Sequence, residues 1–226
     1  MNIGIIGHGY VGLAVHELFR RRHAITVHDP EKYPGEDRIK RLNNHADFIF
    51  VCVPTPMSDD GSCDTSIVDS VCRELAPKDG AVVVLKSTVA PHTTQGLAHK
   101  YELPMVFSPE YAGESSYWSS HKFHSDMRET PFFIFGGPRE LTTKCVELYK
   151  PICGPEKRYL QTDSTTAELV KYAENSFYAT KIMFCYEFAN IAKSFGADWN
   201  EVRELWLADP RINPMHTAVF PSNPRP

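Results

Sequence analysis

Two polar side chains stand where they could act on a carbon–oxygen bond. Lys171 and Asn175 are four residues apart in a long and otherwise apolar helical pattern, so they would lie on one helix face, one turn apart. An ammonium there could stabilise a developing alkoxide, and an amide could orient the same oxygen. The pair would equally suit an exposed polar stripe at the start of the helix.

Other polar groups follow apolar strand patterns. The run SPEYAGE supplies two carboxylates, Glu110 and Glu114, in one loop. Thr88 belongs to the run KSTV and could hold a water or a reacting hydroxyl. Carboxylates in loops are often only solvated. A catalytic role and simple solvent exposure therefore both remain open for Glu110 and Glu114.

A glycine-rich run directly follows the first apolar strand pattern and opens the first helical pattern. Gly7, Gly9 and Gly12, with Tyr10 and Val11 between them, form a GxGxxG motif. The first glycine permits a tight turn, the second lets the backbone approach a pyrophosphate, and the third allows close helix–strand packing. A helix N-terminus also attracts phosphate charge. Glycines also serve ordinary turns, but this strand–loop–helix context indicates a dinucleotide site.

The end of the second strand supplies the expected ribose contact. Asp29 follows the motif by about twenty residues, where a carboxylate can accept hydrogen bonds from an adenosine ribose and would repel a 2′-phosphate. NAD is therefore favoured over NADP. Lys32 could lie near the adenine or the phosphates, or be solvated. Two later strand-end loops could line the nicotinamide side through Val53, Pro54, Thr55, Ser87 and Thr88.

Alternating strand and helix patterns would position these groups. We expect strands at Asn2–Ile6, Ala24–His28, 48–53, 81–86, Met105–Phe107, 132–135 and 158–160. We expect helices at 11–21, 37–44, 65–75, 93–99 and 139–150. Continuous apolar strands suit a parallel sheet covered on both faces. The sequence therefore predicts an α/β fold, a Rossmann-type, doubly wound and mostly parallel sheet over residues 1–160.

Residues 161–226 should form a helical segment with one long helix. Thr165 and Glu168 have capping-box spacing and would open a helix that runs to about residue 195, with Gly196 as its stop. Asp198 and Glu201 would cap a shorter helix over residues 201–208. Because the long helix is apolar on more than one face, we expect a homodimer through it.

Composition and charge argue against several classes of protein. The chain has 226 residues, 42% hydrophobic and 23% charged, with a formal net charge of −4. No nucleic-acid partner, membrane span or leader is expected, and a cytoplasmic location follows by default. The six cysteines form no CxxC pair, and Cys52 and Cys185 should be buried thiols. No metal is expected, although His121 and His124 could form a pair in a polar loop.

The ordered runs GHGYVG, VCVPTPMSDDGSCD, LKSTVAPHTT, FSPEYAGES, AELVKYAENSFYATKIMFCYEFANIAKSFGAD and DPRI cover nearly the whole chain. In these motifs the chain resembles the UDP-glucose/GDP-mannose dehydrogenase family. The resemblance implies oxidation of a nucleotide sugar's primary alcohol to a carboxylate, using two NAD and a cysteine thioester. It implies that Lys171 and Asn175 stabilise the oxyanion and that Thr88 and Glu110 hold and activate water or the transferring proton. Glu114 would be a supporting residue.

Departures from the family pattern leave alternatives open. The chain ends at Pro226, before the family's cysteine loop and second α/β domain, so we expect NAD binding with poor sugar oxidation. Residues 115–130 diverge from the usual pattern of the family, which leaves the identity of the sugar substrate open. One alternative is a single oxidation like that of the β-hydroxyacid dehydrogenases, which share a lysine–asparagine helix but lack the KSTV and SPE loops. The other is a non-catalytic NAD-binding and dimerisation module.

Overall fold

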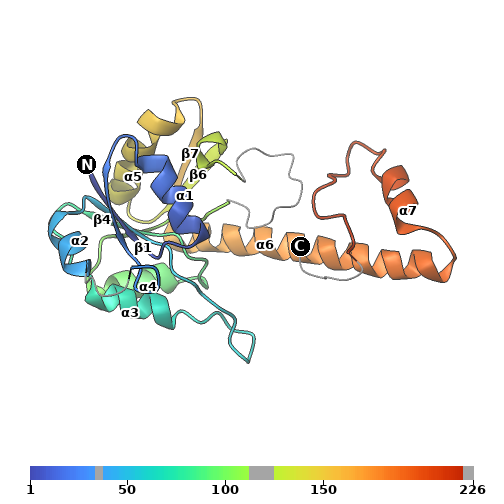
Figure 1. Cartoon of the computed structure of the whole chain (residues 1–226), viewed down its shortest axis with the longest axis horizontal. Helices are drawn as coiled ribbons and strands as arrows, with labels where there is room; N and C mark the ends of the chain where they lie inside the picture. The colour runs from blue at the N-terminus through green and yellow to red at the C-terminus, as the bar shows by residue number, and fades with distance from the viewer. Residues whose placement is uncertain (34–37, 112–124, 221–226) are drawn as a thin grey trace. The chain divides into compact units, whose positions relative to one another are not determined.

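The computed structural model describes residues 1–33, 38–111 and 125–220 of the chain (Figure 1). The expected pair His121 and His124, and the expected supporting residue Glu114, lie outside these residues. Of the described residues, those up to 171 form one compact unit and those from 172 onward form a second. We describe each unit by itself.

Within the described residues, seven strands form one sheet in the order β2-β1-β3-β4-β5-β6-β7. The strands are β1 (Asn2–Ile6), β2 (Ala24–His28), β3 (Phe48–Val51), β4 (Val82–Leu85), β5 (Met105–Phe107), β6 (Phe132–Gly136) and β7 (Arg158–Thr162). All neighbours pair in parallel except β5 and β6, which are antiparallel. The apolar runs of β3 and β4 are buried along their whole length, as strands covered on both faces should be.

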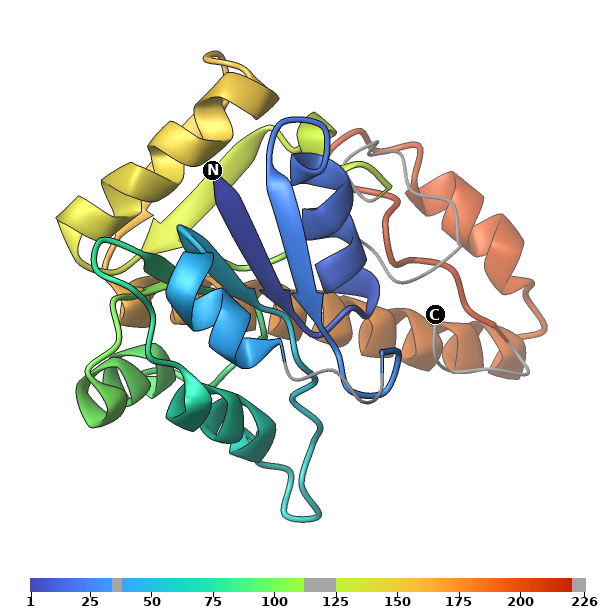
Figure 2. The ribbon, with the colours of Figure 1, turned by 60° about the vertical axis from the view of Figure 1, so that its left-hand side comes forward.

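Two groups of helices cover opposite faces of this sheet (Figure 2). Helices α1 (Tyr10–Phe19) and α5 (Arg139–Cys153) pack on one face, with the short helix η2 (Met127–Glu129). Helices α2 (Ile39–His45), α3 (Ser66–Glu74) and α4 (Thr93–Tyr101) pack on the other. Tyr149 is fully buried in the first core, where its ring meets Phe19, Phe133 and Phe135 at 5.0–5.2 Å between centroids. The predicted doubly wound, mostly parallel fold is confirmed.

The long helix α6 (Ser164–Ser194) begins differently from the prediction. Asp163 caps it, because its carboxylate accepts hydrogen bonds from the backbone N–H of Thr166 at 2.8 Å and from the Thr166 hydroxyl at 2.6 Å. The predicted capping box of Thr165 and Glu168 is wrong. Glu168 turns instead toward α4 and is completely buried there.

The second unit contains the rest of α6 and helix α7 (Trp199–Trp206). Gly196 ends α6 at φ +76°, as predicted, and Asp198 caps α7 by accepting the Asn200 N–H at 2.8 Å. The final described segment is fastened by Arg203, whose Nε donates to the Thr217 hydroxyl at 2.8 Å. Across the described residues, none of the helices, α6 included, combines the length and apolar character of a bilayer span.

Candidate functional site

The glycine loop lies between β1 and α1, next to the point where the order of the sheet reverses. The chain runs from β1 outward to β2 and then returns to β3 on the other side of β1. Gly7 has φ +84°, and a Cβ there would lie 2.7 Å from the Cys52 carbonyl oxygen at the end of β3. A Cβ on Gly12 would lie 2.0 Å from the Gly7 oxygen. Both positions therefore require glycine for the backbone to pack.

Gly9 has a different role in the same loop. A Cβ on Gly9 would meet nothing within 4 Å, so its lack of a side chain leaves space that the protein does not fill. Gly9 caps α1 without a side-chain hydrogen bond, and the first turn, which contains Tyr10 and Val11, carries no acidic residue. Within the described residues, the first turn of α1 therefore has no acidic side chain to oppose an anion at its N-terminus.

Asp29 directly follows β2 and is held by the backbone around it. One oxygen accepts the His8 N–H at 2.7 Å, and the other accepts the N–H groups of Glu31 at 3.1 Å and Lys32 at 3.0 Å. Desolvation would raise the pKa of Asp29, but these hydrogen bonds outweigh it and the pKa is lowered. The Lys32 ammonium donates to the His8 carbonyl oxygen. Asp29 and Lys32 therefore join the glycine loop in one cluster.

The loops after β3 and β4 are fastened to each other. The Ser87 hydroxyl donates to the Val53 carbonyl at 2.6 Å, and the Thr55 hydroxyl donates to the Thr88 carbonyl at 2.7 Å. Ser87 is buried, Thr88 and Thr55 are half-buried, and Pro54 is exposed. The structure thus brings together the two loops that the sequence predicted to line one side of the cofactor.

A buried ion pair joins the ends of β4 and β5. The Lys86 ammonium lies 3.1 Å from a Glu110 carboxylate oxygen, with side-chain exposures of 2% and 9%. Lys86 also lies 3.4 Å from the Pro109 carbonyl oxygen, and the other Glu110 oxygen accepts the Tyr111 N–H at 2.8 Å. Glu110 is therefore held beside the loop of Thr88, the neighbouring strand end of the sheet.

Lys171 lies in the first unit, close to Glu110 in the fold. Its ammonium stands 4.8 Å from the centroid of the Tyr111 ring, the residue that follows Glu110. A cation over an aromatic face is electrostatically attracted to it. Asn175 lies one turn farther along α6, in the second unit, and is exposed.

The start of α6 is locked to the N-terminus of α4. The buried Glu168 carboxylate accepts the backbone N–H groups of His92 at 2.7 Å and Thr94 at 2.8 Å, and the Thr94 hydroxyl at 2.6 Å. His92 has φ +74°, a strained conformation for a residue with a side chain. Glu168 therefore connects the helix that carries Lys171 to the segment that follows Thr88.

Four cysteines are poorly suited to nucleophilic chemistry. Burial raises the pKa of the Cys52, Cys72 and Cys145 thiols to about 12 and that of Cys153 to about 11. All six cysteines of the chain are free thiols. Cys185 is buried as predicted, whereas Cys52, which follows the end of β3, is only half-buried, so that part of the prediction is wrong. A thiol with so high a pKa is protonated near neutral pH and is not a nucleophile.

A doubly wound sheet with a glycine-rich loop at its switch point is the architecture of dinucleotide-binding domains. The model of the UDP-glucose/GDP-mannose dehydrogenase family, NAD binding domain, matches residues 26–152, and that of the family's central domain matches residues 165–221. The chain belongs to the UDP-glucose/GDP-mannose dehydrogenase family. The expectation of NAD as cofactor is confirmed at the level of this family.

Curated relatives are similar along most of the chain. UDP-glucose 6-dehydrogenase YwqF of Bacillus subtilis is 31% identical over 94% of this chain and 56% of its own length. GDP-mannose 6-dehydrogenase of Pseudomonas aeruginosa is 26% identical over 79% of this chain and 43% of its own length. The chain thus spans about half the length of these two curated relatives.

Solved structures share the fold. A ternary complex of GDP-mannose dehydrogenase from Pseudomonas aeruginosa matches with a TM-score of 0.77 at 24% identity, over 94% of this chain and 58% of that one. A Mycobacterium tuberculosis 3-hydroxyisobutyrate dehydrogenase also matches, with a TM-score of 0.73 at 14% identity, over 97% and 76%. The second match shows that the fold alone does not separate the two families, whereas the family models favour the nucleotide-sugar dehydrogenases.

Sequence reasoning missed two residues of this site, Lys86 and Glu168. Lys86 ends the apolar run VVVLK, and a lysine so close to a buried strand should have suggested a buried carboxylate partner. Glu168 was assigned to a local cap, because its spacing from Thr165 matches that motif.

Proposed function

We propose that this chain forms the NAD-binding and central part of a nucleotide-sugar dehydrogenase, which oxidises a sugar's primary alcohol toward the carboxylate. The observation that carries the proposal is the buried Lys86–Glu110 pair. It holds a carboxylate at the strand ends of the same sheet that carries the glycine loop. The chain's family membership supports the same conclusion.

The proposed roles follow from charge and position. The Lys171 ammonium stabilises negative charge on the substrate oxygen, and the Asn175 amide orients that oxygen. Glu110 accepts the proton that leaves the alcohol, directly or through a water held by the Thr88 hydroxyl. Glu114 supports them. NAD supplies the hydride acceptor when it is bound.

The cofactor residues of the proposal divide into three groups. Gly7, Gly9, Tyr10, Val11 and Gly12 receive the diphosphate, and Asp29 and Lys32 receive the adenosine half. Val53, Pro54, Thr55, Ser87 and Thr88 line the nicotinamide half. The nicotinamide group comes from the loops after β3 and β4. The hydrogen bonds between these two loops support this division, because they hold the lining residues in place before a ligand binds.

The test has two steps on the purified 226-residue chain. Calorimetric titration should detect NAD binding, with weaker binding of NADP. NADH absorbance should then be followed with UDP-glucose, GDP-mannose and a 3-hydroxy acid. Slow reduction of NAD by a nucleotide sugar, lost in Lys171→Met with NAD affinity unchanged, supports the proposal. NAD binding with no such reduction would favour the non-catalytic NAD-binding and dimerisation module. Reduction by the 3-hydroxy acid alone would favour the β-hydroxyacid dehydrogenases, and absence of NAD binding would refute the proposal.

We also propose that two copies associate through the second unit. Its helices leave large apolar side chains exposed to an unusual degree: Phe177 (64%), Met183 (60%), Phe184 (46%), Phe188 (43%), Ile191 (46%) and Leu205 (72%). Large apolar side chains exposed in such number on one segment are typical of a protein–protein contact. A second copy of the chain supplies a matching surface through two-fold symmetry. This surface is also what a non-catalytic NAD-binding and dimerisation module would need.

A further inference from the structure

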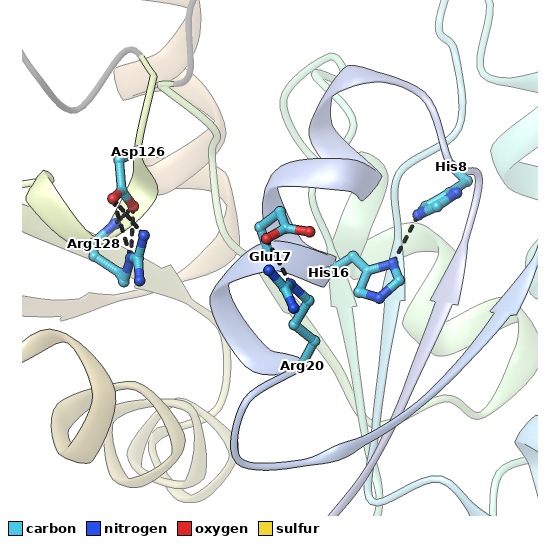
Figure 3. Close-up of polar contacts among 6 residues, drawn as sticks. All are labelled: His8, His16, Glu17, Arg20, Asp126 and Arg128. Atoms are coloured by element: carbon cyan, nitrogen blue, oxygen red, sulfur yellow. Dashed lines mark hydrogen bonds and ion pairs between the residues drawn. The ribbon is translucent and has the colours of Figure 1, made fainter.

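A titratable ring lies inside the glycine loop and bonds to two other elements. The His8 side chain is 5% exposed. Its Nδ1 lies 3.0 Å from the Tyr33 hydroxyl. Its Nε2 lies 3.0 Å from Nδ1 of His16 on α1, the contact drawn in Figure 3. The His8 backbone meanwhile donates to Asp29 and accepts from Lys32. His8 therefore links the diphosphate loop, the first helix and the loop after β2.

The hydrogen bonds of this network accommodate one additional proton. When His8 is neutral, a single proton lies between its Nε2 and the His16 Nδ1, and the Tyr33 hydroxyl can donate or accept. When His8 is protonated, both of its ring nitrogens donate, one to Tyr33 and one to His16, and no hydrogen bond is lost. A second proton on the His16 Nδ1 would set two donors against each other. The hydrogen bonds among His8, His16 and Tyr33 therefore accommodate one added proton but not two.

Charges around the ring oppose that proton while the site lacks a ligand. Burial, His16 and Lys32 lower the pKa of His8, and Asp29 opposes them with a smaller effect. Tyr33 carries the Arg38 guanidinium over its ring at 5.5 Å, which adds another positive group. The ion pairs Glu17–Arg20 and Asp126–Arg128, also drawn in Figure 3, are each neutralised internally. The surroundings of His8 therefore contain more positive than negative charge.

We propose that His8 is a proton-accepting residue of the dinucleotide site. The negative charge of the diphosphate, bound at the glycine loop, stabilises the His8 imidazolium, so that NAD binding takes up a proton into the network of His8, His16 and Tyr33. The proposal rests on the proposed NAD binding. It requires the pKa of His8 to be higher with ligand than without, so affinity rises as pH falls from 8 to 6. Each unit of difference gives up to about tenfold.

Calorimetry of the 226-residue chain tests this coupling. NAD is titrated at pH 6, 7 and 8 in two buffers with different ionisation enthalpies, and the number of protons taken up per NAD follows from the difference in heat. We expect a fraction of one proton at pH 6 and almost none at pH 8, with affinity about three- to tenfold higher at pH 6. Binding of ADP-ribose, which keeps the diphosphate and lacks the nicotinamide, should be accompanied by uptake of the same fraction of a proton.

Three variants assign the proton to this network. His8→Gln should abolish the uptake and flatten the pH profile, and Tyr33→Phe should reduce the uptake because the imidazolium loses one acceptor. His45→Gln, an exposed histidine at the end of α2, is the matched control and should behave as wild type. Should His8→Gln fail to fold by thermal melting, Tyr33→Phe and His16→Gln carry the comparison.

The outcomes separate the two proposals. NAD binding without proton uptake, uptake that persists in His8→Gln, or uptake unchanged in both Tyr33→Phe and His16→Gln would overturn the role of His8 and leave NAD binding intact. No binding of NAD by the wild-type chain would instead refute the proposed function, and the role of His8 with it.

Discussion

The glycines of the diphosphate loop separate folding from ligand binding at the scale of single residues. We predict that Gly12→Ala costs about 2 kcal/mol or more, because its Cβ would overlap the Gly7 carbonyl. Gly9→Ala should cost less, about 1 kcal/mol or under, because its Cβ enters open space and only the poorer N-cap preference of alanine opposes it. It should still weaken NAD binding about tenfold, or about 1.4 kcal/mol. Urea unfolding and NAD titration measure the two effects. A Gly9→Ala variant destabilised as much as Gly12→Ala would contradict the assignment of Gly9 to ligand binding.

The Lys86–Glu110 pair also makes a prediction at this scale. Lys86→Met should destabilise the fold by about 3–5 kcal/mol, because it leaves Glu110 as a buried charge without its counter-ion. Adding Glu110→Gln should recover part of that loss. Lys78→Met is the matched control, since Lys78 pairs with Asp47 at 2.7 Å but is 37% exposed, and its loss should cost under about 1 kcal/mol. Equal costs for the two lysines in urea unfolding would be inconsistent with a buried pair.

At the scale of elements, the joint between α6 and α4 determines where Lys171 lies. Glu168→Ala removes the carboxylate that accepts three hydrogen bonds, from the His92 N–H, the Thr94 N–H and the Thr94 hydroxyl. We therefore predict that it lowers the free energy of unfolding by about 2–4 kcal/mol. Asp163→Ala should cost about 1 kcal/mol, as loss of a helix cap does. Thr165→Ala removes an exposed contact with His92 and should cost less than either. Chemical denaturation ranks the three, and Thr165→Ala as the most damaging would restore the capping box.

At the scale of the whole molecule, association should depend on the second unit. We predict that the wild-type chain is dimeric and that Phe188→Glu or Ile191→Glu makes it monomeric. Burying a carboxylate in an apolar contact costs its desolvation free energy, and no counter-ion compensates for it. Met57→Glu is the control, since Met57 is 80% exposed in the first unit. Light scattering across a concentration series distinguishes the states. A monomeric wild-type chain, or a dimer unaffected by both α6 variants, would exclude this surface.

Patterns within short stretches were enough to predict the layered fold. Apolar runs such as 48–53 and 81–86 indicated buried strands, and the observed strands differ from them by one or two residues at their ends. The glycine loop was equally readable, because its turn, its helix and its spacing to Asp29 are local in the sequence. Gly196 and the cap Asp198 were predicted correctly for the same reason, although α7 begins at Trp199, two residues before the predicted start.

The order of residues along the chain is sufficient to predict the alternation of strands and helices, the family and the types of residue in the candidate site. Three contacts become visible only in the folded chain: Lys86 pairs with Glu110, Glu168 binds the N-terminus of α4, and His8 bonds to His16 and Tyr33. The physical reason is that periodicity and turn chemistry act between near neighbours. The partner of a buried charge or ring is chosen by packing among segments that are far apart along the chain.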